Sequence, residues 1–294
     1  MDKEKMFIRQ TTLPEIGLKG QEKLLNAKIA IVGCGGLGSA AAVYLAATGI
    51  GRIHLIDYDK IEVSNLHRQV FYKTEDVGKS KAKTLARYIQ NISSIVELST
   101  CEEAINKNNI SDELMNYSII LDCTDSLMTK YLLNDYCVLN NKILIYGSLY
   151  KHDGYVGIFN AISKDGRSAH LRDAFPEIPQ KHVPNCSEIG TLNPIVGIIG
   201  LMQANEVIKI ISETGTPLSN KILIYNTMDN SQFIMKLKPA FSKERVAAIF
   251  NEDNYFDAKC EIQDAYLLIE AMQLKNKLQD ANVKIISVMA DPEC

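Results

Sequence analysis

The 294-residue sequence lacks most features of exported, membrane-spanning and nucleic-acid-binding proteins. Its first ten residues, MDKEKMFIRQ, contain no apolar signal-peptide core. The uncharged stretch 189–205 is interrupted by one proline and three glycines, which argues against a transmembrane helix. Lysine and arginine number 32 against 35 acidic residues, so no basic excess favours a nucleic acid or a membrane as partner.

Paired cysteines are also missing. The seven cysteines include no C-x-x-C pair, and their number is odd. Without an export signal they are expected to be reduced thiols of a cytoplasmic protein rather than a disulfide framework. A hydrophobic share of 46% and a charged share of 23% exclude wholesale disorder, and a chain of this length can bury a large core without disulfides.

Strand and helix patterns alternate along the first 150 residues. The expected strands are 28–32, 52–57, 95–100, 118–123 and 142–147, and the expected helices are 39–48, 79–91 and 129–140. Strands at 154–160 and 221–226, a hairpin partner at 232–237 and a buried helix at 194–212 follow. This order predicts a Rossmann-like α/β domain, with a mainly parallel sheet extended by antiparallel strands.

The composition changes twice after this core pattern. Residues 161–194 hold half of the eight prolines and little periodicity, so a long irregular crossover loop is expected there. From about 239 the chain becomes polar and acidic. We expect one domain over 1–240 and a linker with a short tail over 241–294. A helix within 261–280 and a strand at 283–288 are expected in that tail, which is too little for a separate domain.

A glycine-rich turn lies between the first strand and the first helix. Gly33, Gly35 and Gly38 form G-x-G-x-x-G, which permits a tight turn and close approach of the backbone to a phosphate at a helix N-terminus. Asp57 ends the next strand, 19 residues beyond Gly38, where a carboxylate can accept the ribose hydroxyls. These residues predict a nucleotide site and leave NAD and ATP as alternatives.

Further motifs follow in a fixed order. They are Arg9-Gln10, GCGGLG (33–38), IDYD (56–59), SNLHRQ (64–69), GKSK (78–81), DCTD (122–125), PNCSEIG (184–190) and G-x-x-G-x-x-Q-A-x-E (197–206). In content, order and spacing they resemble the MoeB/ThiF/HesA family, the prokaryotic relatives of ubiquitin-activating enzymes. The resemblance covers roughly residues 5–238.

The resemblance implies an activity, cofactors and partners. Family members use ATP and Mg²⁺ to adenylate the C-terminal glycine of a small ubiquitin-like sulfur carrier ending in Gly-Gly, and they release pyrophosphate. Molybdopterin synthesis, thiamine synthesis and tRNA thiolation are the pathways it leaves open. A homodimer is implied, in keeping with the apolar helix near 195–211, and neither a nucleic acid nor a membrane is expected as partner.

The resemblance also assigns residue roles. Gly36 and its neighbours bring the backbone against the nucleotide, and Asp57 holds the ribose. Asn65, Arg68 and Lys81 contact the phosphates. Asp125 sits near the α-phosphate and Mg²⁺, and Arg9 reaches the γ-phosphate in the partner subunit. The nucleotide site is further expected to include Asp59, Ser64 and Ser126.

This residue set suits the chemistry. Attack of a carboxylate on the α-phosphate brings two anions together, so cations must neutralise the triphosphate and donors must stabilise the growing charge. Arginine offers a planar fork to phosphate oxygens, and lysine offers a point charge.

Cys186 lies in the PNCSEIG segment. It resembles the loop cysteine that forms a thioester or persulfide in some family members. A thiol there could take the acyl group from the adenylate, because thiolate is a strong nucleophile. The alternative is a small loop residue without chemistry, and both readings stay open.

Two departures from the family pattern stand out. Many members hold a structural zinc with two C-x-x-C pairs, but here the first pair reads His170 to Asp173 and the second has no cysteine. We therefore expect no structural zinc and a surface position for His170, since two ligands do not close a tetrahedral site. Residues 255–262 resemble the join that leads into a C-terminal rhodanese domain in some MoeB-like proteins, and residues 283–293 resemble the first strand of that domain. The tail is therefore expected to be a truncated or degenerate remnant without sulfurtransferase activity. Clear thiosulfate:cyanide turnover would contradict this.

Other functions remain as alternatives. A Rossmann dehydrogenase would need an acid–base residue facing a nicotinamide, and no feature of the sequence supplies one. A non-catalytic adaptor of the same fold conflicts with the intact set of charged motif residues. A tRNA-modifying dehydratase of the same superfamily is disfavoured by the absence of basic excess and by the PNCSEIG segment.

Overall fold

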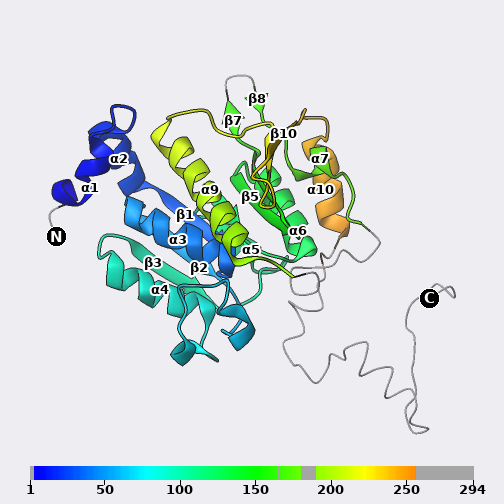
Figure 1. Ribbon diagram of the computed structural model, residues 1–294. Helices are drawn as coiled ribbons and strands as arrows, with labels where there is room; N and C mark the ends of the chain where they lie inside the picture. Colours follow the sequence, from blue (N-terminus) through cyan, green and yellow to red (C-terminus); the bar gives the residue numbers. More distant parts are fainter. Residues whose placement is uncertain (1–2, 164–165, 180–189, 254, 256–294) are drawn as a thin grey trace, which may run out of the picture. The chain divides into compact units, whose positions relative to one another are not determined.

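The computed structural model describes residues 3–163, 166–179, 190–253 and 255 (Figure 1). Its main sheet has the strand order β10-β9-β6-β5-β4-β1-β2-β3. The strands are β1 (Lys28–Val32), β2 (Arg52–Ile56), β3 (Glu97–Cys101), β4 (Ile119–Asp122), β5 (Ile143–Tyr150), β6 (Asp153–Phe159), β9 (Lys221–Asn226) and β10 (Gln232–Lys236). The pairs β3–β2, β2–β1, β1–β4 and β4–β5 are parallel. The pairs β5–β6, β6–β9 and β9–β10 are antiparallel. The expected sheet and its hairpin are confirmed.

The central strand β1 faces a hydrophobic core on each side. Ile29 and Ile31 belong to one core, and Ala30 and Val32 belong to the other. Side chains alternate along a strand, so a continuous apolar run such as KIAIV suits a parallel strand covered on both faces. The first core is closed by helices α3 (Gly36–Thr48), α4 (Lys81–Ile92) and α9 (Asn193–Ser212). The second is closed by α5 (Ile110–Leu114), α6 (Leu127–Leu139) and α7 (Leu171–Ala174).

Helix α9 lies close to the sheet because glycines on the strands leave room for it. A Cβ at Gly147 would collide with Gln203, and one at Gly154 would collide with Ile199. By length and composition alone, α9 is apolar enough to cross a membrane. It packs instead against α3, β5 and β6, which is the position of a core helix (Figure 1).

Several elements were not expected from the sequence. Helices α1 (Lys3–Thr11) and α2 (Gly17–Asn26) precede β1, and two 3-10 turns, η1 (Val63–Asn65) and η2 (Thr74–Asp76), follow β2. The described part of the crossover segment contains β7 (Ile162–Ser163), β8 (Gly166–Arg167) and α7.

The segment after residue 240 begins with a helix instead of the expected linker. Where a linker was expected, α10 (Lys243–Glu252) is capped by Ser242, whose hydroxyl accepts a hydrogen bond from the Arg245 N–H at 3.2 Å. The buried side chain of Val246 packs with Phe241 and Val138. Contacts divide the chain into Met1–Asp257 and Ala258–Cys294, so α10 belongs to the first unit. The helix and strand expected within 261–288 lie outside the described residues.

Candidate functional site

The glycine turn joins the carboxyl end of β1 to the start of α3. Gly33 has φ of +92°, a left-handed conformation that favours glycine, and a Cβ there would contact the Cys123 carbonyl. A Cβ at Gly38 would collide with the Gly33 carbonyl, and one at Gly36 would collide with Val196. The glycines therefore permit tight packing of turn, helix and neighbouring strand. No side chain among the described residues caps the N-terminus of α3, so its first N–H groups can face an anion.

Asp57 follows β2 and is held against the glycine turn. Its carboxylate accepts hydrogen bonds from the backbone N–H of Cys34 at 2.6 Å and of Asp59 at 2.8 Å. Only 9% of the residue is exposed, and this burial raises the pKa of its carboxyl to about 6, although the positive charge of Lys81 acts in the opposite direction. The carboxylate thus lies at the edge of the turn with its charge fixed in place.

Lys81 interacts with three of the acidic residues that were predicted for the nucleotide site, Asp57, Asp59 and Asp125. It is the first residue of α4, is buried, and its Nζ donates to the Asp59 carboxylate at 2.7 Å. Burial lowers the pKa of Lys81, but the carboxylates of Asp57, Asp59 and Asp125 outweigh that effect, and the pKa is raised. Asp125 itself is exposed in the loop after β4. One buried cation therefore interacts with acidic residues that follow two different strands.

The start of the loop that carries Asp125 is held by the buried ion pair between Asp122 and Lys130. Asp122, at the end of β4, accepts hydrogen bonds from the Thr124 N–H at 3.1 Å and the Thr124 hydroxyl at 2.8 Å. Lys130 of α6 lies 3.1 Å from the Asp122 carboxylate and donates to the Gly147 carbonyl at 2.7 Å. Sequence reasoning missed Lys130, although a lysine among the apolar residues of α6 is a visible signal.

The SNLHRQ segment forms the end of η1 and the turn that follows it, and it packs against the glycine turn. Asn65 is buried, and its side-chain oxygen accepts from the Glu62 N–H at 3.2 Å. Arg68 Nη1 donates to the Ser64 carbonyl at 3.0 Å and lies 3.0 Å from the His67 Nε2, which leaves Nε and Nη2 for other acceptors. The Arg68 carbonyl lies 3.1 Å from the position of a Cβ on Gly36. Ser126, also assigned to the nucleotide site, is the N-cap of α6 and accepts from the Thr129 N–H at 3.1 Å.

Arg9 is not brought to this site. It is exposed on α1, and its neighbour Gln10 donates to the carbonyl of Thr48, the last residue of α3, at 3.0 Å. The glycine turn lies at the opposite end of α3, about 18 Å away for a helix of this length. Arg9 therefore cannot serve the glycine turn of its own chain. Cys186 lies outside the described residues.

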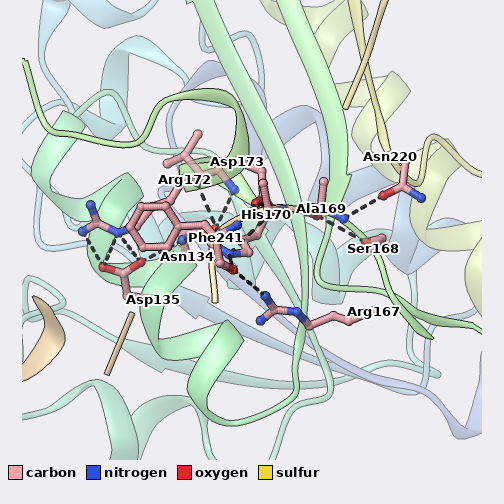
Figure 2. Close-up of polar contacts among 12 residues, drawn as sticks. Asn134, Asp135, Arg167, Ser168, Ala169, His170, Arg172, Asp173, Asn220 and Phe241 are labelled. Carbon is pink, nitrogen blue, oxygen red and sulfur yellow. Dashed lines mark hydrogen bonds and ion pairs between the residues drawn. The ribbon is translucent and has the colours of Figure 1, made fainter. Parts of the chain in front are cut away.

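The prediction of a surface position for His170 is wrong. Its side chain is fully buried between α6 and the segment before α10 (Figure 2). One imidazole nitrogen lies 3.3 Å from the Phe241 carbonyl, and the other lies 3.4 Å from the Asn134 amide. The Asp173 carboxylate accepts hydrogen bonds from three backbone N–H groups: those of His170 at 2.8 Å, Ala240 at 2.7 Å and Phe241 at 2.6 Å. The two segments at which the family resemblance would place the zinc ligands are joined here by hydrogen bonds.

A buried ion pair fixes the same segment to α6. Arg172 donates to the Asp135 carboxylate through Nε at 2.8 Å and Nη2 at 2.6 Å (Figure 2). The Tyr255 hydroxyl donates to the same carboxylate at 2.6 Å, and the Tyr131 ring lies 4.9 Å from the guanidinium carbon. Arg172 and Asp135 are both buried. Among the described residues no group of three or more His, Cys, Asp and Glu side chains is placed to hold a metal ion.

Comparison with known proteins adds to this geometry. The model of the ThiF family matches residues 7–246. A sulfur carrier protein adenylyltransferase from Thermus thermophilus is 36% identical over 227 residues, which cover 76% of this chain and 84% of the relative. An adenylyltransferase and sulfurtransferase MOCS3 from Caenorhabditis briggsae is 39% identical over 233 residues, covering 79% of this chain and 57% of the relative. The chain spans about half the length of the MOCS3 relatives it matches.

Solved structures share the fold. E. coli MccB in complex with MccA-N7isoASN superposes with a TM-score of 0.71 at 26% identity, over 82% of this chain and 73% of that one. The structure of PaaA superposes with a TM-score of 0.68 at 23% identity, over 81% of this chain and 74% of that one. Both have the Rossmann-like adenylation fold expected here.

Proposed function

Since the chain belongs to the ThiF family, we propose that it adenylates the C-terminal carboxylate of a small ubiquitin-like sulfur-carrier protein with ATP. The observation that carries the proposal is the assembly of Asp57, Lys81 and Asp125 at the uncapped N-terminus of α3. A hydride-transfer enzyme has no need of a buried lysine at that place.

The proposed reaction is a substitution at the α-phosphorus of ATP. An oxygen of the carrier's carboxylate forms the new bond, and the bond to the bridging oxygen breaks as pyrophosphate leaves. Lys81 and Arg68 provide the positive charge that offsets the approach of two anions, and the N–H groups of α3 provide fixed dipoles. Asp57 orients the nucleotide by accepting the ribose hydroxyls. We expect Asn65, Ser64 and Ser126 to line the same site.

Magnesium fits the proposed site through Asp125. In nucleotide sites this ion is held by one or two carboxylates together with phosphate oxygens, so a closed set of protein ligands is not required. An exposed carboxylate whose charge reaches the buried Lys81 provides such a ligand. The ion would offset phosphate charge during the substitution.

We also propose that the active unit is a homodimer. Supporting this is the exposure of large apolar side chains on the first three helices, namely Ile8 (54%), Leu18 (74%) and Tyr44 (53%), and of Leu13 (53%) between the first two. The distance of Arg9 from its own glycine turn points the same way, because the role that family resemblance gives it must then be performed on the partner.

ATP–pyrophosphate exchange tests the proposed activity. Exchange should depend on a ubiquitin-like protein ending in Gly-Gly, and Asp125→Ala should lower it by at least about a hundredfold. Asp112→Ala, which removes an exposed carboxylate on α5, is the matched control and should leave the rate unchanged. ATP binding without exchange, whichever carrier is supplied, would contradict adenylation of such a carrier and favour a non-catalytic protein or a different carboxylate substrate.

A further inference from the structure

A cluster of polar side chains lies at the β3 edge of the sheet, and the proposed adenylation uses none of them. It contains His54 of β2, Ser99 of β3 and Glu113 of α5. His54 and Ser99 are partners in the register of the two strands, so their side chains stand beside each other on one face of the sheet. The helix α5 brings Glu113 to the same imidazole.

The imidazole of His54 bridges the other two groups. Its Nδ1 lies 2.8 Å from the Ser99 hydroxyl oxygen, and its Nε2 lies 2.7 Å from a Glu113 carboxylate oxygen. An ionised carboxylate only accepts hydrogen bonds, so in the neutral imidazole Nε2 carries the proton and Nδ1 accepts from Ser99. The Tyr117 ring stacks on the imidazole, with centroids 5.3 Å apart and planes 5° from parallel. Both the orientation and the tautomer of His54 are therefore fixed.

The three residues differ in their access to solvent. His54 is only 6% exposed and Glu113 is half-buried, whereas Ser99 is exposed. A hydroxyl that is hydrogen-bonded to a base, with the base oriented by a third group, is the arrangement that activates a serine as a nucleophile. Here the base and its orienting carboxylate are held by the protein, and the nucleophile is the member that a substrate can reach.

The surroundings of Ser99 suit a small substrate. With Leu98, Thr100 and four residues of α4 it lines a cavity of about 260 Å³, which suits a short acyl group. The Glu97 N–H and the Cys101 carbonyl bond on the β2 side of the strand. Backbone groups alternate in direction along a strand, and β3 is terminal among the described strands, so the Thr100 N–H points to the free edge. A backbone N–H beside the nucleophile is a donor that can stabilise an oxyanion.

We propose that Ser99, His54 and Glu113 form a second catalytic site, which hydrolyses small carboxylic esters without ATP. The Ser99 oxygen forms a bond to the ester carbonyl carbon, and its proton passes to His54 Nδ1. The bond from that carbon to the leaving oxygen breaks, and the alcohol leaves with the proton from His54. Glu113 stabilises the imidazolium that forms between these two transfers.

Water then releases the acyl group from Ser99. Its oxygen forms a bond to the acyl carbon, and one of its protons passes to His54. The bond between that carbon and the Ser99 oxygen breaks, the proton returns to this oxygen, and a carboxylic acid leaves. The site regains its starting state and consumes only the ester and one water.

The test treats the full-length chain with p-nitrophenyl acetate in the absence of ATP. Release of p-nitrophenolate gives the rate, and mass spectrometry of the digested chain locates the acetyl group. We expect acetyl on Ser99, and Ser99→Ala should lower the catalysed rate by at least about a hundredfold. Glu113→Gln keeps the shape of the side chain but removes its charge, and should slow acetylation of Ser99 by at least about tenfold. Ser94→Ala, at an exposed serine before β3, is the matched control and should leave the rate unchanged.

Two results would overturn the proposal. One is a folded wild-type chain that takes up no acetyl group at Ser99, a result that requires no variant and so stands even if a substitution unfolds the chain. The other is acetylation of Ser99 at the same rate in the wild type and in Glu113→Gln, because the hydroxyl would then react without help from the pair behind it. Pyrophosphate exchange should be unchanged in Ser99→Ala, so the proposed adenylation stands or fails separately.

Discussion

At the scale of single residues, burial determines the chemistry of Asp57. The pKa of its carboxyl is raised to about 6 because the residue is enclosed, and two backbone N–H groups fix its orientation. A carboxylate accepts hydrogen bonds from ribose hydroxyls through both oxygens, whereas the protonated form must donate one of its own. The affinity for the nucleoside should therefore follow the ionisation of this single group.

We expect the affinity for adenosine to fall by about tenfold per pH unit below pH 6, as Asp57 takes up a proton. Adenosine is chosen because it has no phosphate to titrate, and titration calorimetry between pH 5 and 8 measures it. Asp57→Asn should bind adenosine weakly at every pH and show no such slope. An affinity that stays constant between pH 7.5 and 5 would contradict the assignment.

Lower pH should weaken adenosine binding through Asp57, but the same raised pKa should increase the contribution of this residue to the free energy of unfolding. Because the folded-state pKa of Asp57 lies above its ordinary value of 3.8, the folded chain binds this proton more readily than the unfolded chain. The contribution of Asp57 to the free energy of unfolding therefore rises as pH falls from about 6 toward 3.8. Ligand affinity and this contribution to stability move in opposite senses over that range.

The residues of the site differ in how far the sequence predicted them. Asp57, Lys81 and Asp125 follow strand ends or open a helix within ordered motifs, and in a parallel sheet such positions meet at one edge. The sequence wrongly predicts a surface position for His170 because the burial of its side chain depends on Phe241, which lies 71 residues further along the chain.

At the scale of elements, the short helix α7 combines an apolar attachment with buried polar ones. It has only four residues: Leu171 packs in the second core, Arg172 pairs with Asp135, and Asp173 bonds the segment before α10 (Figure 2). Burial lowers the pKa of His170 at the same junction, although the carboxylate of Asp173 acts against this. The imidazole is therefore neutral in the folded chain at neutral pH.

Breaking the Arg172–Asp135 pair from one side should be costly. We expect Arg172→Met to lower the free energy of unfolding by about 3–5 kcal/mol, because it leaves a buried carboxylate without its cation. Urea denaturation measures the change. The double variant Arg172→Met/Asp135→Leu should recover most of the loss, since it removes both charges.

Tyr255→Phe is the control for that experiment, because it removes one hydrogen bond to Asp135 and keeps the ion pair. It should cost about 1–3 kcal/mol, which is less than the loss of the cation. If Arg172→Met were no more destabilising than Tyr255→Phe, the ion pair would not be what holds this segment.

The elements of the core were predictable, and those at its margin were not. The strands β1, β2 and β4 are buried on both faces and consist mostly of apolar residues, so their sequence pattern is easily recognised. The polar composition of 241–252 predicts a linker where the structure has α10, and Val246 is the one buried residue of this helix among those described. A helix that docks through so narrow an apolar face leaves little trace in the periodicity of a sequence.

At the scale of the whole molecule, the position of Arg9 is the main constraint. It lies on α1, near the end of α3 that is remote from the glycine turn. If Arg9 has the proposed role at the γ-phosphate, an isolated chain carries an incomplete site, and two chains related by a twofold axis complete each other's sites.

Mixed dimers test this arrangement. Arg9→Ala and Asp125→Ala each remove one half of a shared site, and dimers of either variant alone should be inactive in pyrophosphate exchange. Dimers that combine one chain of each, purified through two different tags, keep one intact site of two and should regain about half of the wild-type rate. Mixed dimers no more active than the single variants would show that Arg9 does not act across the interface.

The outer strand of the sheet has a consequence for handling the protein. Among the described residues β10 is one of the two terminal strands of the sheet, and its Phe233 and Ile234 are 64% and 48% exposed. A terminal strand presents free backbone donors and acceptors, and apolar side chains beside them promote pairing with any other extended chain. In concentrated solution this edge favours self-association by strand addition, so purified samples should gain solubility when Phe233 is replaced by lysine.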